Sequence, residues 1–377
     1  MIVVGRRRPA LEAVLSPLTP AASGSAISPL LPQPVRPRPA GLSATALLSH
    51  TRRRPLSTRI ETGEEGSLSV LRVALLAGSQ SAWLRRRATR SRFVRRAVSR
   101  FMPGETLDEA LVACRGLVDR GKGAILTQLG ENVTDATEAQ AVERHYLSVL
   151  ERLRAEKLDI EISVKLTQLG LDLSFENACD HVRAIAGRAR ESGVRVWIDM
   201  EATPYTESTL EVFRRVRATH DNVGVCLQAY LRRTAADVEA LLPIGPAIRL
   251  VKGAYQEPES LAYTHKREVD ESFFTLTCRL LSADALAAGT WLALGTHDPR
   301  LIARIEAHAA GSGVARDRFE FALLYGIQRE QQARLAAAGY RVRVLVSYGS
   351  HWFPWYMRRL AERPANVLFA LRGIFGR

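Results

Sequence analysis

Polar side chains recur at the ends of short β-branched runs, where a parallel sheet would gather them at one rim. In chain order these residues are Glu131, Lys165, Asp199 with Glu201, Gln228, Arg249 with Lys252, Thr296 with His297 and Asp298, Tyr325, and Tyr348. A purely structural sheet would end its strands in turn residues and caps. We therefore interpret the set as a functional site.

The residue types in this set favour binding of an anion. His297 and Asp298 form an isolated pair without the spacing of a metal site, so no metal is expected. No Ser or Cys stands in a recognisable nucleophile motif. Basic groups around an apolar pocket suit an anionic cofactor or a substrate carboxylate. In that case the cofactor itself supplies the chemistry.

A second basic group lies near the end of the chain. The stretch WFPWYMRRLAERPAN (352–366) places Arg358 and Arg359 just past four aromatic residues. In the ordinary interpretation, a helix buries its aromatic face and leaves both arginines in water. If the helix covers the rim, the arginines face inward toward Lys165 and Glu131, and the aromatic rings shape the pocket. We favour the second interpretation.

The elements that must position these residues alternate regularly from residue 105 onward. Amphipathic helical patterns separate eight short runs: 123–131, 161–170, 195–201, 223–230, 247–255, 290–298, 319–326 and 341–349. Such alternation predicts an α/β fold, a (βα)8 barrel of the TIM type, with its chemistry at the carboxyl ends of the strands. A doubly wound open sheet is the alternative, but no GxGxxG motif follows the first run.

Several rim residues have a structural alternative. Asp199 and Glu201 could cap the helix that follows them, and His297 could be a hydrogen-bonded core histidine. Lys165 fits a structural role poorly, because an unpaired buried lysine costs several kcal/mol.

Positive charge is concentrated at the N-terminus. The chain has a net charge of +14; residues 1–104 hold 18 Arg against 4 Glu, and residues 105–377 are balanced. A neutral body with a basic leader argues against a nucleic-acid-binding fold. Residues 1–67 lack periodicity, which predicts a disordered segment, either a targeting extension or the product of a misassigned upstream start.

Residues 68–104 form a separate basic segment. Its first part, 68–101, contains no acidic residue and predicts basic amphipathic helices, either attached to an anionic membrane surface or packed on the body. No apolar run reaches the roughly 18 residues of a membrane span. Four scattered cysteines fit a reducing compartment, so we expect a cytoplasmic protein with peripheral membrane contact as an option. The barrel is expected to occupy residues 105–377.

The motifs SVKLTQLG, WIDME, CLQAYLRRT, RLVKGAY and THD, together with YGSHWFPWYMRRLAERPAN, resemble those of the proline dehydrogenase family in the same order. The resemblance spans roughly residues 68–377 and implies a monofunctional, FAD-dependent enzyme. Its expected fold is a distorted (βα)8 barrel with a C-terminal helix over the substrate. The implied reaction converts L-proline to 1-pyrroline-5-carboxylate: a hydride passes from proline C5 to flavin N5, and the electrons then pass to a membrane quinone.

Roles follow from the resemblance at matching positions. Arg358, Arg359 and Lys165 resemble the clamp for the substrate carboxylate, and Glu131 resembles the acid that pairs with Arg358. Asp199 and Arg249 resemble a catalytic polar pair beside the flavin. The residues that resemble flavin contacts are Gln228, Arg249, Val251, Lys252, Gly253, Ala254, Thr296 and His297. Gly253 would let the backbone approach a ligand closely, and Lys252 would stabilise charge on the reduced ring.

Two substrate-pocket positions depart from the family pattern. Leu345 and Trp355 stand where tyrosines are usual in the family. The pocket should therefore be more apolar at Trp355 and roomier at Leu345. L-proline remains the expected substrate, with hydroxyproline or another substituted imino acid as the alternative. Two other functions fit the sequence less well. A phosphosugar barrel lacks the Gly-rich loops expected after the last two strands, and an adaptor for nucleic acid or membrane conflicts with the neutral body.

Overall fold

The computed structural model describes residues 96, 98–353 and 356–357. The predicted segment 1–67, most of segment 68–104, and the site residues Trp355, Arg358 and Arg359 lie outside the described residues.

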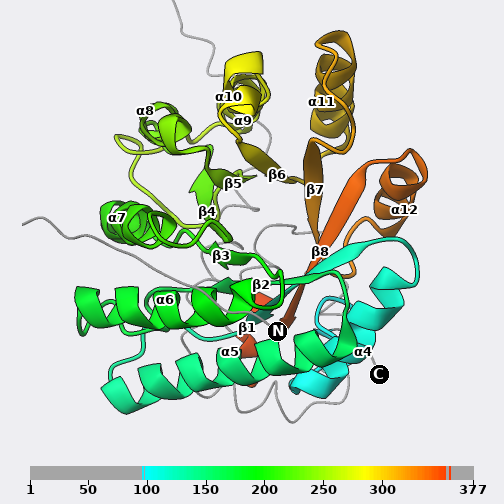
Figure 1. Cartoon of the computed structure of the whole chain (residues 1–377). Helices are drawn as coiled ribbons and strands as arrows, with labels where there is room; N and C mark the ends of the chain where they lie inside the picture. The colour runs from blue at the N-terminus through cyan, green and yellow to red at the C-terminus, as the bar shows by residue number, and fades with distance from the viewer. Residues whose placement is uncertain (1–95, 97, 354–355, 358–377) are drawn as a thin grey trace, which may run out of the picture. The chain divides into compact units, whose positions relative to one another are not determined.

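Eight parallel strands close into a barrel in the order of the sequence, and β1 pairs with β8 (Figure 1). The strands are β1 (Gly123–Gln128), β2 (Ile160–Val164), β3 (Val196–Ile198), β4 (Val223–Gln228), β5 (Ala247–Val251), β6 (Trp291–Gly295), β7 (Phe319–Leu324) and β8 (Arg341–Tyr348). The predicted (βα)8 barrel is confirmed. Most strands end just before their polar residues. Lys165, Asp199, Lys252, Thr296 and Tyr325 each directly follow the last residue of a strand.

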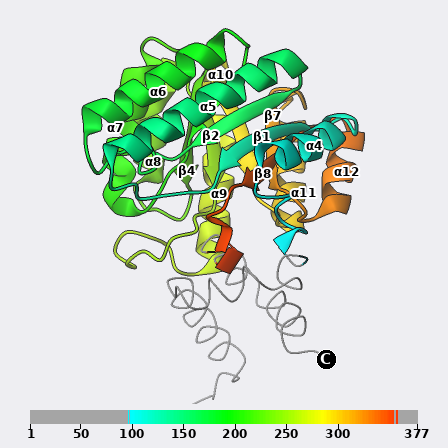
Figure 2. The same cartoon turned by 90° about the horizontal axis from the view of Figure 1, so that it is seen from below.

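Helices surround this barrel on the outside. They are α4 (Leu107–Val118), α5 (Ala136–Glu156), α6 (Phe175–Arg190), α7 (Thr206–Arg217), α8 (Thr234–Leu241), α9 (Lys266–Leu280), α10 (Ala283–Ala287), α11 (Pro299–Gly311) and α12 (Arg329–Ala337), with short 3-10 turns η1 (Thr203–Tyr205) and η2 (Leu242–Ile244). In the view from below, α5 and α6 run side by side on the outside of the barrel (Figure 2). Their buried faces are apolar, so the main hydrophobic core lies between helices and sheet.

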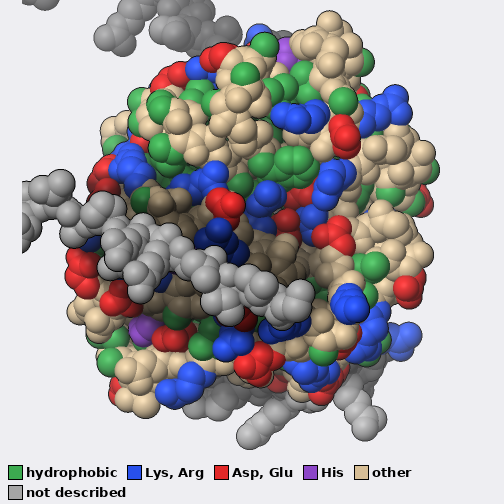
Figure 3. Space-filling view, in the orientation of Figure 1, with side chains coloured by type: hydrophobic (Ala, Val, Ile, Leu, Met, Phe, Trp, Pro, Cys, Tyr) green, Lys and Arg blue, Asp and Glu red, His purple; other side chains and the backbone are tan. Residues whose placement is uncertain are grey.

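Local sequence signals start several helices. Thr106 and Glu109 form a capping box at α4, and Asp298 accepts backbone N–H groups at the start of α11, where Pro299 occupies the first turn. On the face drawn in Figure 3, Lys and Arg side chains are interspersed with Asp and Glu side chains. This mixture agrees with the balanced charge of residues 105–377 and differs from a basic binding face.

One large side chain, that of Trp197, fills much of the barrel interior, and smaller residues surround it. Trp197 of β3 is fully buried among Ile125, Ala247 and Ala293. The large indole fits because the neighbouring strand offers Gly224 beside it. A Cβ added to Gly224 would lie 2.6 Å from the Trp197 ring. One large side chain thus occupies the space that small residues on the surrounding strands leave open.

A buried ionic cluster closes the amino-terminal end of the barrel. Arg343 Nε lies 3.0 Å from Glu320 Oε2 and 3.3 Å from Glu161 Oε2, and Arg343 Nη1 donates to Asp159 at 2.8 Å. Burial, followed by repulsion from Glu161, outweighs the attraction of Arg343 and raises the pKa of Glu320 to about 7. We call Glu161, Glu320 and Arg343 the floor cluster.

Glu320→Gln is expected to flatten the pH dependence of stability. The usual carboxyl pKa is 4.5, and the folded value is about 7. Between these values the folded state binds more protons than the unfolded chain, so stability falls as pH rises, by at most about 1.4 kcal/mol per pH unit. The variant cannot titrate there. When melting temperatures are measured over this pH range, the difference between the variant and the wild type should shift in favour of the variant as pH rises. Exposed Glu151→Gln serves as the control, and parallel curves for Glu320→Gln and the wild type would contradict the prediction.

Candidate active site

A cavity of about 610 Å³ lies at the carboxyl ends of strands β3 to β8. Its volume falls within the usual range for small-molecule sites. The predicted site residues that line it are Asp199, Arg249, Val251, Lys252, Gly253, Ala254, Thr296, His297 and Leu345. Residues from strands far apart in the sequence therefore meet at one rim, as the motif positions predicted.

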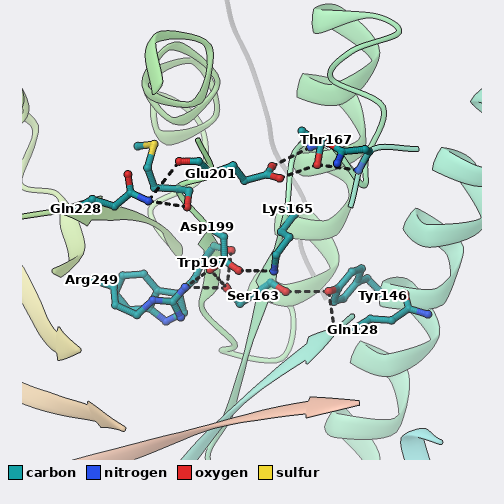
Figure 4. A network of polar contacts seen from close by, with 12 residues as sticks. Gln128, Tyr146, Ser163, Lys165, Thr167, Trp197, Asp199, Glu201, Gln228 and Arg249 are labelled. Carbon is teal, nitrogen blue, oxygen red and sulfur yellow. Dashed lines mark hydrogen bonds and ion pairs between the residues drawn. The ribbon is translucent and has the colours of Figure 1, made fainter. Parts of the chain in front are cut away.

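Asp199 is the centre of a polar network beside this cavity (Figure 4). Its Oδ2 accepts a hydrogen bond from Lys165 Nζ at 2.9 Å, and its Oδ1 accepts from Ser163 Oγ at 2.7 Å. Arg249 Nη2 donates to the same Oδ1 and to Ser163 Oγ, the latter at 2.9 Å. The partners of Asp199 lie in or directly after β2 and in β5. The N-cap position of the next helix, η1, is Ala202, and no side chain caps that helix. The alternative that Asp199 caps the next helix is wrong.

The charges in this network stabilise one another. Burial would raise the pKa of Asp199, but the positive charges of Lys165 and Arg249 hold it at about 2. Burial would likewise lower the pKa of Lys165 and of Arg249, and the Asp199 carboxylate raises both above their usual values. All three groups are therefore charged at neutral pH. Two cations share one carboxylate, and the remaining positive charge suits an anionic ligand.

Sequence reasoning missed Ser163 and Tyr146. Ser163 lies inside β2, two residues before Lys165. Because side chains two residues apart in a strand share a face, Ser163 could have been placed on the inner face with Lys165. The Tyr146 hydroxyl of α5 donates to Ser163 O at 2.8 Å and accepts from Gln128 N at 3.1 Å. It thus bridges β1 and β2 beyond their last paired residues, Leu126 and Ile162. Nothing in the helical pattern distinguishes Tyr146 from an ordinary core residue.

A second charged group lies along the cavity wall. Lys252 Nζ bonds to Asp270 and lies 3.4 Å from Asp298 Oδ2. Lys266 Nζ bonds to Asp270 and to Asp298 Oδ2, the latter at 2.7 Å. Burial tends to raise the pKa of Asp298, but Lys266 and Lys252 hold it at about 2. Lys266 and Asp270 were missed because an i,i+4 pair at the start of a helix looks like a solvated surface pair.

His297 and Thr296 are held by backbone groups. His297 Nε2 accepts a hydrogen bond from Leu324 N at 3.1 Å, which assigns the proton of the neutral ring to Nδ1. Thr296 Oγ1 accepts from Asp298 N at 3.2 Å. His297 is therefore both a hydrogen-bonded structural histidine and part of the cavity wall.

Glu201, Gln228 and Glu131 do not line the cavity. Glu201 accepts from Thr167 Oγ1 at 2.6 Å and from Thr167 N at 3.1 Å. It ties β3 to the turn after β2 and does not cap η1. Gln228 Nε2 donates to the carbonyls of Met200 and Glu201, both at 3.3 Å. Neither Gln228 nor Glu131 lines the cavity, and the expected partner of Glu131 lies outside the described residues.

Gly253 has a structural requirement besides its expected contact with the cofactor, and the expected place of Tyr348 at the rim needs correction. Gly253 has φ +118°, and a Cβ added there would lie 2.2 Å from the Tyr230 ring, so backbone conformation and packing already require glycine. Tyr348 points away from the rim, and its hydroxyl lies 2.7 Å from His145 Nε2 on α5. Counting in steps of two from Arg343 and Leu345 would have placed Tyr348 on the outer face of β8.

Three aromatic residues of the C-terminal segment also lie elsewhere than expected; the fourth, Trp355, is outside the described residues. Trp352 Nε1 donates to Glu105 Oε1 at 3.0 Å, and the Tyr356 ring lies 6.4 Å from that of Phe101. Trp352, Phe353 and Tyr356 are buried against one another and do not line the cavity. The expectation that they shape the pocket is wrong, because the segment before α4 covers them.

Among the described residues, no group of three His, Cys, Asp or Glu side chains could hold a metal ion. All four cysteines are free thiols. In the same part of the chain, no helix has the length and apolar character that a membrane span needs.

Comparisons with known proteins all match the chain to proline dehydrogenases. A family model described as "Proline dehydrogenase" matches residues 110–372. The chain is 40% identical over 276 residues to "Proline dehydrogenase 1" of Bacillus subtilis (strain 168), covering 73% of this chain and 89% of the relative. It is 35% identical over 284 residues to "Proline dehydrogenase" of Deinococcus radiodurans, with the same two shares.

Solved structures agree with these relatives. Proline utilization A from Bdellovibrio bacteriovorus, in a form inactivated by N-propargylglycine, has a TM-score of 0.69 and 25% sequence identity. The match covers 84% of this chain and only 38% of that protein. The likeness therefore concerns one part of a much longer chain.

Proposed function

Because the chain belongs to the proline dehydrogenase family and is an enzyme of proline oxidation, we propose that it forms 1-pyrroline-5-carboxylate from L-proline with FAD bound in the 610 Å³ cavity. The observation that carries this proposal is the network around Asp199, in which two buried cations share one carboxylate at the cavity edge.

The cavity fits a flavin in three respects. Arg249 is buried and lines the cavity, and its Nη1 has no hydrogen-bond partner among the described residues. A buried donor of this kind needs an acceptor, which a flavin ring offers. Lys252 and Lys266 line another part of the wall. Lys252 would stabilise charge on the reduced ring, and Lys266 would attract the phosphate groups. Ile125, Ala322 and Leu345 supply apolar surface. The bound flavin would accept the hydride that leaves proline C5.

The chain's own residues would bind and orient the substrate. Lys165, together with Arg358 and Arg359, would hold the proline carboxylate. Asp199 directs the Lys165 ammonium group and keeps it charged. The positive charge around the ligand would also favour the neutral form of the proline amine. The nitrogen lone pair is then available to form the C=N bond as C5 loses its hydride.

Substrate choice would depend on the apolar wall. Leu345 is half-buried, packs against the cluster of Ile125 and Trp197, and lines the cavity. It offers no hydroxyl to a substituted ring. We propose L-proline as the main substrate and keep 4-hydroxyproline as the alternative, because the space beside Leu345 is larger than a tyrosine would leave.

The electron acceptor and location are further proposals. We propose a membrane quinone as acceptor, reached from the cytoplasmic side. Free cysteines fit a reducing compartment. The segment 68–101 proposed for membrane contact lies outside the described residues.

Purified protein is expected to be yellow, and its flavin absorption should bleach on addition of L-proline without oxygen. With a dye acceptor, kcat/KM for L-proline should exceed that for trans-4-hydroxyproline. A colourless protein that fails to bind added FAD would contradict the cofactor assignment. Strong preference for the hydroxylated ring would replace the proposed substrate with the alternative.

A further inference from the structure

Arg249 is the buried cation that borders the proposed flavin site, and one edge of its guanidinium group is fixed. Nη2 is held by Asp199 and Ser163, whereas Nη1 has no hydrogen-bond partner among the described residues. Besides these bonds at Nη2, the guanidinium group meets only one further acceptor in the described part of the chain, the Cys226 thiol, which is a weak one, so its plane can still tilt. A second contact is needed to set the direction in which Nη1 points.

Trp197 supplies that second contact. The Arg249 Cζ atom lies 5.3 Å from the centroid of the Trp197 ring, within the range of a cation–π interaction. Both side chains are buried, so water screens the attraction little. Tryptophan is the aromatic residue with the strongest attraction for a cation. Trp197 itself does not line the cavity, and it would therefore act only through Arg249.

The indole is in turn anchored to the floor cluster. Trp197 Nε1 donates to Glu161 Oε2 at 2.6 Å, and Glu161 is buried. Arg343 lies 3.3 Å from the same carboxylate oxygen. Trp197 thus spans the barrel from a rigid ionic cluster at its amino-terminal end to the cation at its carboxyl end. Gly224 gives the ring its place, since a Cβ there would lie 2.6 Å from the indole.

We propose that Trp197 is a positioning residue for the reaction: the indole, held by Glu161, fixes the plane of the Arg249 guanidinium group and so the direction of its free donor toward the flavin. This inference rests on the proposed function. An interaction of this kind, between buried groups, is expected to be worth about a tenfold change in rate.

Trp197→Leu and Trp197→Phe form the first test. Three quantities are measured: kcat with proline per bound flavin, the midpoint potential of the flavin, and the melting temperature. Leu removes the aromatic face, so kcat should fall about tenfold and the potential should shift. Phe keeps a face and should restore kcat to within about threefold of the wild type. The control Phe213→Leu removes a fully buried ring in α7. It should lower the melting temperature but leave kcat per flavin and the potential unchanged.

Fluorinated tryptophans at position 197 provide a test that preserves the fold. Each added fluorine weakens the negative face of the ring while keeping its shape and its N–H group. A graded fall in kcat per flavin and a graded shift in potential are expected. A flat fluorotryptophan series would overturn the positioning role, because those rings keep the N–H bond to Glu161 and change only the face. Failure of the proposed function is distinguishable, since the wild type itself would then lack flavin or proline turnover.

Discussion

Asp199→Asn is expected to lower kcat/KM for proline by about 100- to 1,000-fold. The substitution keeps the size of the side chain but removes the carboxylate that Lys165 and Arg249 share. Leaving buried cations without their partner costs about 3–5 kcal/mol. Both side chains should then move away from their present positions, and the carboxylate clamp and the flavin-facing donor should be lost together.

The pH dependence of substrate binding provides a second readout of this variant. In the wild type, burial lowers the pKa of Lys165, and the charge of Asp199 more than compensates. Without that charge the Lys165 pKa falls, so the ammonium group loses its proton at a lower pH than before. In Asp199→Asn, KM for proline should therefore begin to rise at a lower pH than in the wild type.

Asp237→Asn is the matched control for Asp199→Asn. Asp237 is also a buried carboxylate paired with an arginine, Arg233, but it lies on α8 away from the cavity. Its replacement should reduce stability and leave kcat/KM per bound flavin unchanged. If Asp199→Asn behaved in the same way, the network around Asp199 would be purely structural.

Lys165→Met is expected to raise KM for proline about 10- to 100-fold, with a smaller change in kcat. Methionine keeps much of the apolar stem and removes only the charge that would meet the carboxylate. Arg249 still pairs with Asp199, so the carboxylate keeps one of its two cations. Pyrrolidine lacks the carboxylate of proline. Steady-state kinetics with both substrates therefore separate the binding of the substrate carboxylate by Lys165 from its pairing with Asp199. The preference for proline over pyrrolidine should fall by about the same factor, because only proline has the group that Lys165 would bind.

Lys122→Met is the matched control for Lys165→Met. Lys122 is a buried lysine directly before β1, at the opposite end of the barrel. Its replacement should leave the preference for proline unchanged. If Lys165→Met also left the preference for proline over pyrrolidine unaltered, Lys165 would not bind the substrate carboxylate.

The sequence was sufficient to predict the barrel, because its signals are local. Short β-branched runs alternate with amphipathic helices, and caps such as Asp298 mark where helices begin. Polar residues at the ends of the runs predicted a rim, and nine of the predicted site residues line one cavity. The same local signals could not assign Tyr348, because its side chain faces α5.

What the sequence determined by itself was the order of the strands, the rim on which the polar groups meet, and the difference in charge between residues 1–104, which are basic, and residues 105–377, which are balanced. Only the tertiary structure decided which groups pair. Closure of the sheet brings Asp199, which follows β3, between Lys165, which follows β2, and Arg249 of β5. It also sets Trp197 against both Arg249 and Glu161. These contacts depend on distances between strands that are far apart in the chain, and no local pattern encodes such distances.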